Sequence, residues 1–240
     1  MNIVLLQAHD WLDGQRVRLR DQRADHIRSV LRAVPGDNLR VGQLGGLRGQ
    51  GRVEAIGADG VELTVALQEP PPARHRFDIV LALPRPKMLR RILRTVAEFG
   101  VGNLHLIQTA RVEKSYWQSP LLRSAKLAEA LQAGLERSGD TIAPRVHLQP
   151  RFRPFIEDQL PLICAGRPCW IAHHQATEPL SSKPPQAAVV LIGPEGGFVP
   201  FELQLAETLI AQRVHLGDRI LSVDTALTTV LAQALPGSHP

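Results

Sequence analysis

The sequence predicts an α/β protein of two domains, a small β-barrel followed by a parallel sheet flanked by helices. Up to about residue 70, short runs alternate apolar and polar residues between glycine-containing turns, as antiparallel strands do. From Phe77 onward, apolar strands alternate with helical patterns, which is typical of a parallel sheet. Pro70, Pro71 and Pro72 stiffen the chain between the two patterns, so we predict domains at 1–72 and 73–240.

The first domain is expected to hold four strands and one helix. The helical pattern runs over 24–32 and ends before the turn signal Pro35-Gly36-Asp37. The expected strands are at 17–19, 38–41, 51–56 and 61–67.

The second domain is expected to alternate five strands with four helices. Leu89, Ile92, Leu93 and Val96 fall at helical spacing, so they predict the buried stripe of a helix at 87–99. Asp224 is expected to be the N-cap of the last helix. The expected strands are at 78–83, 104–107, 169–173, 187–192 and 213–217, and the helices at 87–99, 119–136, 201–211 and 224–235.

Composition indicates an ordinary globular protein in the cytoplasm. None of the apolar stretches approaches the roughly twenty residues of a membrane span, and the N-terminus lacks a signal-peptide pattern, so we expect no membrane partner. Two cysteines imply no disulfide framework. Cys164, Cys169, His173 and His174 do not match the spacing of a standard zinc site, so we expect no metal.

Positive charge is concentrated in one part of the chain. The net charge is +5, but residues 74–126 contain eleven basic residues and only three acidic ones. Such a surplus favours a polyanionic partner such as nucleic acid, although an arginine-rich solvated surface is the alternative. Lys87, Arg90, Arg91 and Arg94 share two turns of one expected helix with no acid among them, which favours a face that follows phosphates.

Two short loops, each following an apolar strand, predict a ligand pocket. The strand at 187–192 leads into Gly193-Pro-Glu-Gly-Gly197, where glycines let backbone groups approach a ligand closely. The loop lacks the spacing of the common nucleotide-phosphate motifs, so it suits a ligand held by backbone groups, although such a turn can be purely structural. The second loop follows Leu216-Gly217 and leads into the last helix. In a parallel sheet both loops lie beyond the carboxyl ends of their strands, where ligands bind.

These two loops resemble those of the RsmE family of 16S ribosomal RNA methyltransferases, in the SPOUT superfamily. The resemblance rests on 191–198, on Leu216-Gly217 and on Ile220-Leu221 with Thr225-Ala226, and it extends to 24–37 and 97–101. It implies a trefoil-knotted SPOUT domain that binds S-adenosylmethionine (SAM), a PUA-like RNA-binding β-barrel at 1–72, and a homodimer. It also implies methyl transfer from SAM to N3 of a uridine in the RNA of the small ribosomal subunit.

The resemblance implies three groups of site residues. Arg219 lies between the loops and is the cation that could stabilise a uridine anion, with a buried structural arginine as the alternative. The expected cofactor-binding residues are His173, Leu191, Ile192, Gly193, Pro194, Glu195, Gly196, Gly197, Leu216, Gly217, Ile220, Leu221, Thr225 and Ala226. The expected RNA-binding residues are His26, Arg28, Arg32, Arg85, Lys87, Arg90, Arg91 and Arg94.

The chain departs from the family pattern at four positions that we expect to face the substrate. Ser222 stands where the family has arginine, Asp224 where it has glutamate, Asp140 where a base is common and Thr95 where lysine is common. Two alternatives therefore stay open. One is a catalytically weak RNA-binding paralogue, and the other is a methyltransferase that acts on a different RNA, such as tRNA.

Overall fold

A computed structural model describes residues 2–235 and divides them into two compact units. The first comprises residues 2–72 and 133–143, and the second comprises residues 73–132 and 144–235. In this part of the chain, no helix is long and apolar enough to cross a membrane.

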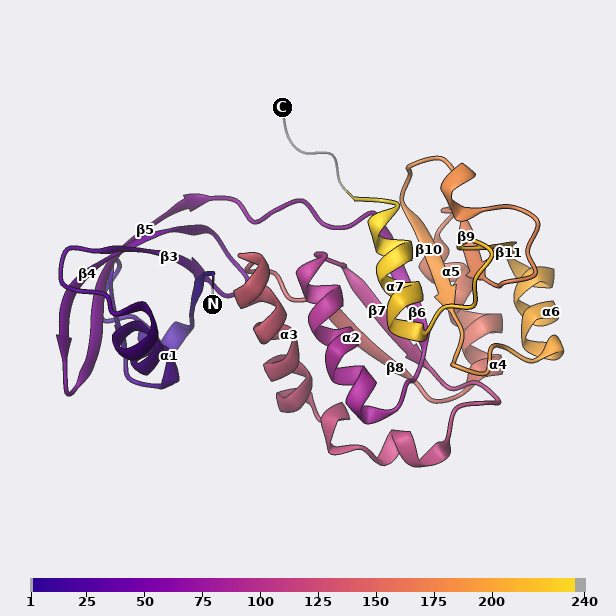
Figure 1. Cartoon of the computed structure of the whole chain (residues 1–240), viewed down its shortest axis with the longest axis horizontal. Helices are drawn as coiled ribbons and strands as arrows, with labels where there is room; N and C mark the ends of the chain where they lie inside the picture. Colours follow the sequence, from indigo (N-terminus) through magenta and orange to yellow (C-terminus); the bar gives the residue numbers. More distant parts are fainter. Residues whose placement is uncertain (1, 236–240) are drawn as a thin grey trace. The chain divides into compact units, whose positions relative to one another are not determined.

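The first unit is built on a curled, mostly antiparallel sheet in the order β1-β3-β4-β5-β2 (Figure 1). β1 pairs with β3 in parallel, and the other neighbours are antiparallel. The order leaves β1 and β2 at the two edges, so the described strands make a half-barrel where a small β-barrel was expected. The strands are β1 (Val4–Leu6), β2 (Arg16–Leu19), β3 (Asn38–Gln43), β4 (Arg48–Gly57) and β5 (Gly60–Glu69).

One helical segment and a buried ion pair complete the first unit. The helix α1 (Gln22–His26) begins at the N-cap Asp21 and continues as a wider π-helical turn (Ile27–Leu31). The Arg23 guanidinium is 2% exposed and donates to both carboxylate oxygens of Asp10 at 2.7 Å. Because both charges are buried, each needs the other, and this pair fixes the start of α1 against the sheet.

The second unit contains a six-stranded parallel sheet in the order β11-β9-β10-β6-β7-β8. The two central strands, β6 and β10, are buried along their whole length, as expected where helices cover both faces of a sheet. The strands are β6 (Phe77–Ala82), β7 (Asn103–Ile107), β8 (Arg145–Gln149), β9 (Cys169–Ala172), β10 (Ala188–Ile192) and β11 (Ala211–Val214).

Helices cover the two faces of this sheet (Figure 1). On one face, α7 packs against α2 and β10, and the stripe Leu89, Ile92, Leu93 and Val96 of α2 is buried as predicted. On the other face, α4, α5 and α6 cover a core that includes Phe155, Leu191 and Leu203. The helices of this unit are α2 (Pro86–Glu98), α4 (Phe152–Pro154), α5 (Leu160–Cys164), α6 (Pro200–Leu209) and α7 (Val223–Ala232), and the helix α3 (Ser124–Ser138) has residues 124–132 in the second unit and 133–138 in the first.

Short turns link these elements. α4 and α5 are joined through a π-helical turn (Phe155–Gln159). The 3₁₀ turns are Ala8–Asp10, Lys114–Gln118, Pro120–Leu122 and Leu180–Ser182.

Several expectations about elements are corrected. β1, β8 and the helical stretch from α4 to α5 were not predicted, so the parallel sheet has six strands and not five. α3 begins at Ser124 and not at Ser119, because Pro120–Leu122 forms a separate 3₁₀ turn. The remaining helices and strands lie within a few residues of their predicted ranges.

Candidate active site

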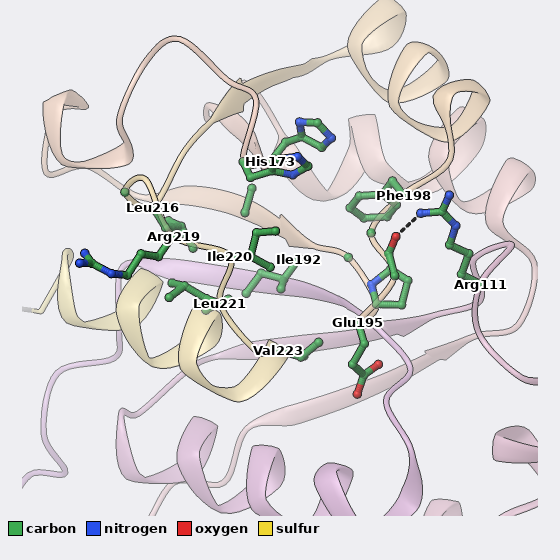
Figure 2. Close-up of a pocket in the computed structure, with 18 residues that line it drawn as sticks. Arg111, His173, Ile192, Glu195, Phe198, Leu216, Arg219, Ile220, Leu221 and Val223 are labelled. Carbon is green, nitrogen blue, oxygen red and sulfur yellow. Dashed lines mark hydrogen bonds between the residues drawn. The ribbon is translucent and has the colours of Figure 1, made fainter.

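The carboxyl ends of three neighbouring strands, β9, β10 and β11, form one pocket of about 260 Å³ (Figure 2). The three strands are parallel, so their carboxyl ends meet at one edge of the sheet, where α/β proteins bind ligands. The segments that follow these strands supply most of the wall, and the first turn of α7 and Arg111 from the loop after β7 supply the rest.

Most residues predicted to bind the cofactor line this pocket. The lining residues among them are His173, Ile192, Gly193, Pro194, Glu195, Gly196, Gly197, Leu216, Gly217, Ile220, Leu221 and Ala226. Leu191 does not line it, because its side chain belongs to the buried core. Thr225 does not line it either; its side chain is exposed, and its hydroxyl lies 2.9 Å from that of Ser222.

The wall also includes residues that sequence reasoning missed. Ala172 and His174 flank His173 at the end of β9, Phe198 follows Gly197 directly, and Val223 lies between the predicted residues Leu221 and Thr225. A wider window around each motif would have found these four. Arg111 comes from the loop after β7, and the motifs gave no signal for it.

Apolar side chains make up one side of the pocket. Ile192, Phe198 and Val223 are buried, and each presents part of its surface to the hollow. Ile220 is different, because 83% of this large apolar side chain is exposed. Figure 2 shows Ile220 over the middle of the pocket, above Ile192 and Leu221. This side is therefore suited to an apolar or aromatic ring.

The Gly193–Gly197 loop forms a cradle that side chains would fill. An added Cβ at Gly196 would lie 2.9 Å from Cδ of Arg111, and one at Gly193 would lie 3.0 Å from the ring of Phe198. Gly197 has φ of +72°, a conformation that disfavours other residues. Because these positions carry no side chains, the backbone groups of this loop can contact a ligand in the pocket.

Arg111 fixes the shape of this loop. Its Nη1 donates a hydrogen bond to the carbonyl oxygen of Gly196 (Figure 2). The guanidinium carries five donors, so one bond to the loop leaves others free for a ligand.

Two histidines close the pocket at the end of β9. The rings of His173 and His174 stack with their centroids 4.8 Å apart. Burial lowers the pKa of His173, and the neighbouring His174 lowers it further. His173 is therefore a neutral ring at neutral pH, able to accept or donate a hydrogen bond.

The start of α7 differs from the expectation. The N-cap is Ser222, so the prediction of Asp224 as the N-cap was wrong, and Asp224 lies in the first turn. The Asp224 carboxylate accepts a hydrogen bond from the Ser222 hydroxyl at 2.6 Å. The same carboxylate forms an ion pair with Arg91 of α2 at 3.1 Å. The hydrogen bond from Ser222 lowers the pKa of Asp224, and the charge of Arg91 acts in the same direction.

Arg219, the predicted catalytic residue, lines the pocket and is exposed. In Figure 2 its guanidinium extends away from the side of the pocket that holds Arg111 and Glu195. Arg219 can therefore contact a second ligand at the rim of the pocket.

The predicted RNA-binding residues of the second unit lie along α2 and at its start. Arg85, Lys87, Arg90 and Arg91 are exposed, whereas Arg94 is half-buried. Arg91 forms an ion pair with Asp224 of α7. No acid stands among these cations in the sequence, but in the folded protein an acid from another helix neutralises one of them.

The predicted RNA-binding residues of the first unit surround the end of α1. Arg32 is exposed and His26 is half-buried. Arg28 pairs with Asp25 at 3.1 Å and donates to the carbonyl oxygen of Gly57 at 2.9 Å, so part of its donor capacity is already used.

Asp140 was expected to face the substrate, and this is wrong. Its side chain is 3% exposed and accepts hydrogen bonds from the backbone N–H groups of Thr141 and Ile142 at 2.7 and 3.1 Å. Asp140 therefore shapes the turn after α3. Thr95 is half-buried on α2.

Comparison with known proteins places these observations in one family. A family model described as "RNA methyltransferase domain" matches residues 71–235. Among curated relatives, Ribosomal RNA small subunit methyltransferase E of Treponema pallidum is 29% identical over 245 aligned positions, covering 100% of this chain and 92% of the relative. The protein of the same name from Synechocystis is 27% identical, covering 95% of this chain and 76% of the relative.

Solved structures share the fold. A Ribosomal RNA small subunit methyltransferase E from Neisseria gonorrhoeae, bound to SAM, superposes with a TM-score of 0.76 at 23% identity, covering 98% of this chain and 95% of the other. A methyltransferase from Legionella pneumophila, also in complex with SAM, gives 0.74 at 20% identity, covering 97% and 95%. The resemblance to the RsmE family that the loops predicted is confirmed, and this chain belongs to the RNA methyltransferase family.

Proposed function

We propose that this protein transfers the methyl group of SAM to N3 of a uridine in the RNA of the small ribosomal subunit. The observation that carries the proposal is the pocket in which the two glycine-containing loops meet at adjacent strand ends. The names of the curated relatives support the RNA substrate, and the SAM-bound structures of related fold support the cofactor.

The residues of the pocket fit SAM. The cradle at Gly193–Gly197 and the segment Leu216–Leu221 offer backbone N–H and C=O groups at the edge of an apolar wall, which suits an adenine ring. Glu195 and His173 offer polar side chains for the ribose and the amino-acid part. When bound, SAM supplies an electrophilic methyl group on a sulfonium.

The chain's own contribution to the reaction is binding, orientation and charge. The apolar wall would cover part of the bound cofactor, and the loop that Arg111 holds would help to align the reacting groups, so positioning would carry much of the rate. Neutral uridine has no free lone pair at N3, so its proton must leave. Arg219 at the rim would stabilise the resulting uridine anion through its fixed positive charge.

Two surfaces are proposed to deliver the RNA. In the second unit, Arg85, Lys87, Arg90, Arg91 and Arg94 would neutralise phosphates. In the first unit, the curled sheet supports its assignment as a PUA-like RNA-binding domain at 1–72, with His26, Arg28 and Arg32 toward the RNA. The target base would leave its stack to reach the pocket.

Three architectural features belong to the same proposal. The domain at 73–240 would be a SPOUT domain with a trefoil knot; the packing of α7 against α2 and β10, after the chain has formed β11, supports such threading. The exposed Ile220 beside the pocket supports a homodimer in which the partner completes the site. A ribosomal substrate would place the protein in the cytoplasm.

One observation favours a second candidate, an RNA-binding protein with weak catalysis or with another RNA target. Ser222 replaces the arginine expected from the family and donates to Asp224, so no cation projects from this position. Ser222→Arg tests this candidate, and a large gain in turnover would favour it.

Calorimetric titration with SAM tests the proposed function first. Micromolar binding at one site per chain is expected, followed by methylation of small-subunit particles and identification of the product nucleoside by mass spectrometry. Methylation of tRNA in place of these particles would favour the other RNA target. A folded protein without SAM binding would overturn the proposal.

A further inference from the structure

A second hollow, of about 370 Å³, lies on the same edge of the parallel sheet as the candidate active site. Its walls come from the segments after β7 and β8 and from the first turn of α6. The residues that matter here are Thr109, Lys114, Phe152, Arg153, Phe201 and Glu202.

The second hollow adjoins the first through shared segments of chain. Arg111 lines the first pocket, whereas its neighbours Ala110 and Val112 line the second hollow. In the same way, Phe198 lines the first and Val199 the second. A ligand that extends beyond the first pocket on this side therefore meets the second hollow next.

Two aromatic side chains give the second hollow flat apolar surfaces. Phe201 is 54% exposed at the start of α6, an unusual position for a large apolar ring. Phe152 is half-buried, and its ring centroid lies 6.4 Å from that of Phe198. Exposed aromatic faces beside cations are the means by which proteins hold single-stranded bases.

The charges at the rim suit a phosphate. Lys114 is exposed and has no ion-pair partner among residues 2–235. Arg153 is also exposed and pairs only with Glu157 of the described residues, at 2.8 Å. The carboxylate of Glu202 is already committed, because its two oxygens accept the N–H groups of Ala110 and Val199 at 2.6 and 2.9 Å.

The wall also contains a polar atom without a partner. The Thr109 hydroxyl is buried, and no hydrogen-bonding group of the described residues reaches it. Buried polar atoms are ordinarily paired, so this wall has capacity for one hydrogen bond from a ligand or water.

We infer that the second hollow is a subsite for an unpaired nucleotide next to the target base, with the base on Phe201 and Phe152 and a phosphate at Lys114 and Arg153. The inference rests on the proposed function, and it adds that the enzyme holds a flanking nucleotide by stacking. An acidic peptide would use the cations, but it would have no use for two aromatic faces.

Two pairs of variants test the subsite on the full-length protein. Phe201→Ala removes the stacking face, and Leu209→Ala is the matched control, because Leu209 is 43% exposed on the same helix and does not line the hollow. Lys114→Gln removes the free cation, and Arg145→Gln is its control at the amino end of β8.

The binding probe is a short single-stranded RNA with a central uridine, followed by fluorescence anisotropy. Phe201→Ala should weaken RNA binding by about fivefold or more. Lys114→Gln should reduce the slope of log affinity against log salt by about 0.7. SAM affinity and kcat should stay at the wild-type value while KM for RNA rises, and the two controls should match wild type.

Cross-linking supplies a direct readout. An RNA with 4-thiouridine beside the target position should attach to a peptide that contains Phe152 or Phe201. If RNA binding and cross-linking are unchanged in Phe201→Ala, or if the variant loses only acidic-peptide binding, the subsite is overturned. If wild type fails to bind SAM while Phe201→Ala still weakens RNA binding, the proposed function falls and the subsite stands.

Discussion

Arg111 and Gly196 are 85 positions apart in the chain, yet the guanidinium of Arg111 donates to the carbonyl oxygen of Gly196. The bond connects the loop after β7 to the loop after β10, two strands separated in the sheet only by β6. The carbonyl has no side chain of its own loop to hold it, so Arg111 determines which way this peptide group faces.

Loss of this bond should weaken cofactor binding without unfolding the protein. Arg111→Met keeps most of the side-chain length but removes the donors, and we expect the Kd for SAM to rise on the order of threefold to tenfold. Because Arg111 is exposed, the midpoint of urea unfolding should hardly change. Calorimetric titration gives the Kd. Equal SAM affinity in the variant would show that the loop keeps its shape without Arg111.

Gly196→Val should weaken SAM binding at least as much as Arg111→Met does and spare RNA binding. A Cβ here would lie 2.9 Å from Cδ of Arg111, so the valine must displace Arg111 or the loop. Gly14→Val is the control, since no atom lies within 4 Å of the corresponding Cβ. SAM titration and RNA anisotropy are measured on both variants; parallel loss of both ligands in Gly196→Val would instead reveal a folding defect.

Arg90 and Arg91 of α2 should differ in their effects on SAM binding. Arg90→Gln should weaken RNA binding and reduce its salt dependence, and should leave SAM binding unchanged. Arg91→Gln should also weaken SAM binding, because Arg91 pairs with Asp224 at the start of α7, beside the pocket residues Val223 and Ala226. RNA anisotropy at several salt concentrations and SAM titration separate the two effects. Identical profiles for the two variants would contradict this assignment.

The buried His105 should make stability depend on pH. Burial lowers its pKa from 6.5 to about 4, and the stacked ring of His147, with centroids 4.4 Å apart, contributes to the shift. Between these two pKa values the unfolded chain binds a proton that the folded chain does not. The contribution of His105 to the free energy of unfolding should therefore be fully present above pH 6.5. It should be lost progressively as the pH drops toward 4, by about 3 kcal/mol in total.

Urea unfolding at a series of pH values checks this expectation. His105→Phe should flatten the pH dependence over that window, because it removes the titrating group and leaves an apolar ring beside Phe155. Burial also lowers the pKa of His75, so a smaller slope of the same sign should remain. An unchanged slope in the variant would show that His105 does not titrate in this way.

The sequence predicted best where a pattern is long or chemically special. The buried stripe of α2 met the first condition and the two glycine-containing loops met the second, and the structure brings the loops together at one pocket. β8 was missed because it is an edge strand, partly exposed along its length, whose residues Arg145–Gln149 lack a run of apolar side chains. β1 spans only three residues, too few to show alternation.

Long-range side-chain contacts could not be predicted in the same way. Arg111 and Arg91 are ordinary arginines in sequence, and only the order of the strands and the packing of α2 on α7 bring them to the pocket. Asp140 was expected to face the substrate because a base is common at this position of the resembled family, but the turn after α3 buries its carboxylate, which accepts two backbone N–H groups. The spacing of residues along the sequence does not reveal contacts between segments that are far apart in the chain.

The exposed isoleucine over the pocket has a thermodynamic consequence. Ile220 keeps 83% of its surface in water, and water around an apolar group contributes to the heat capacity of the free protein. Any occupant that covers Ile220, whether cofactor or second chain, releases that water. The enthalpy of association should therefore become more exothermic with rising temperature, and Ile220→Ala should reduce this temperature coefficient.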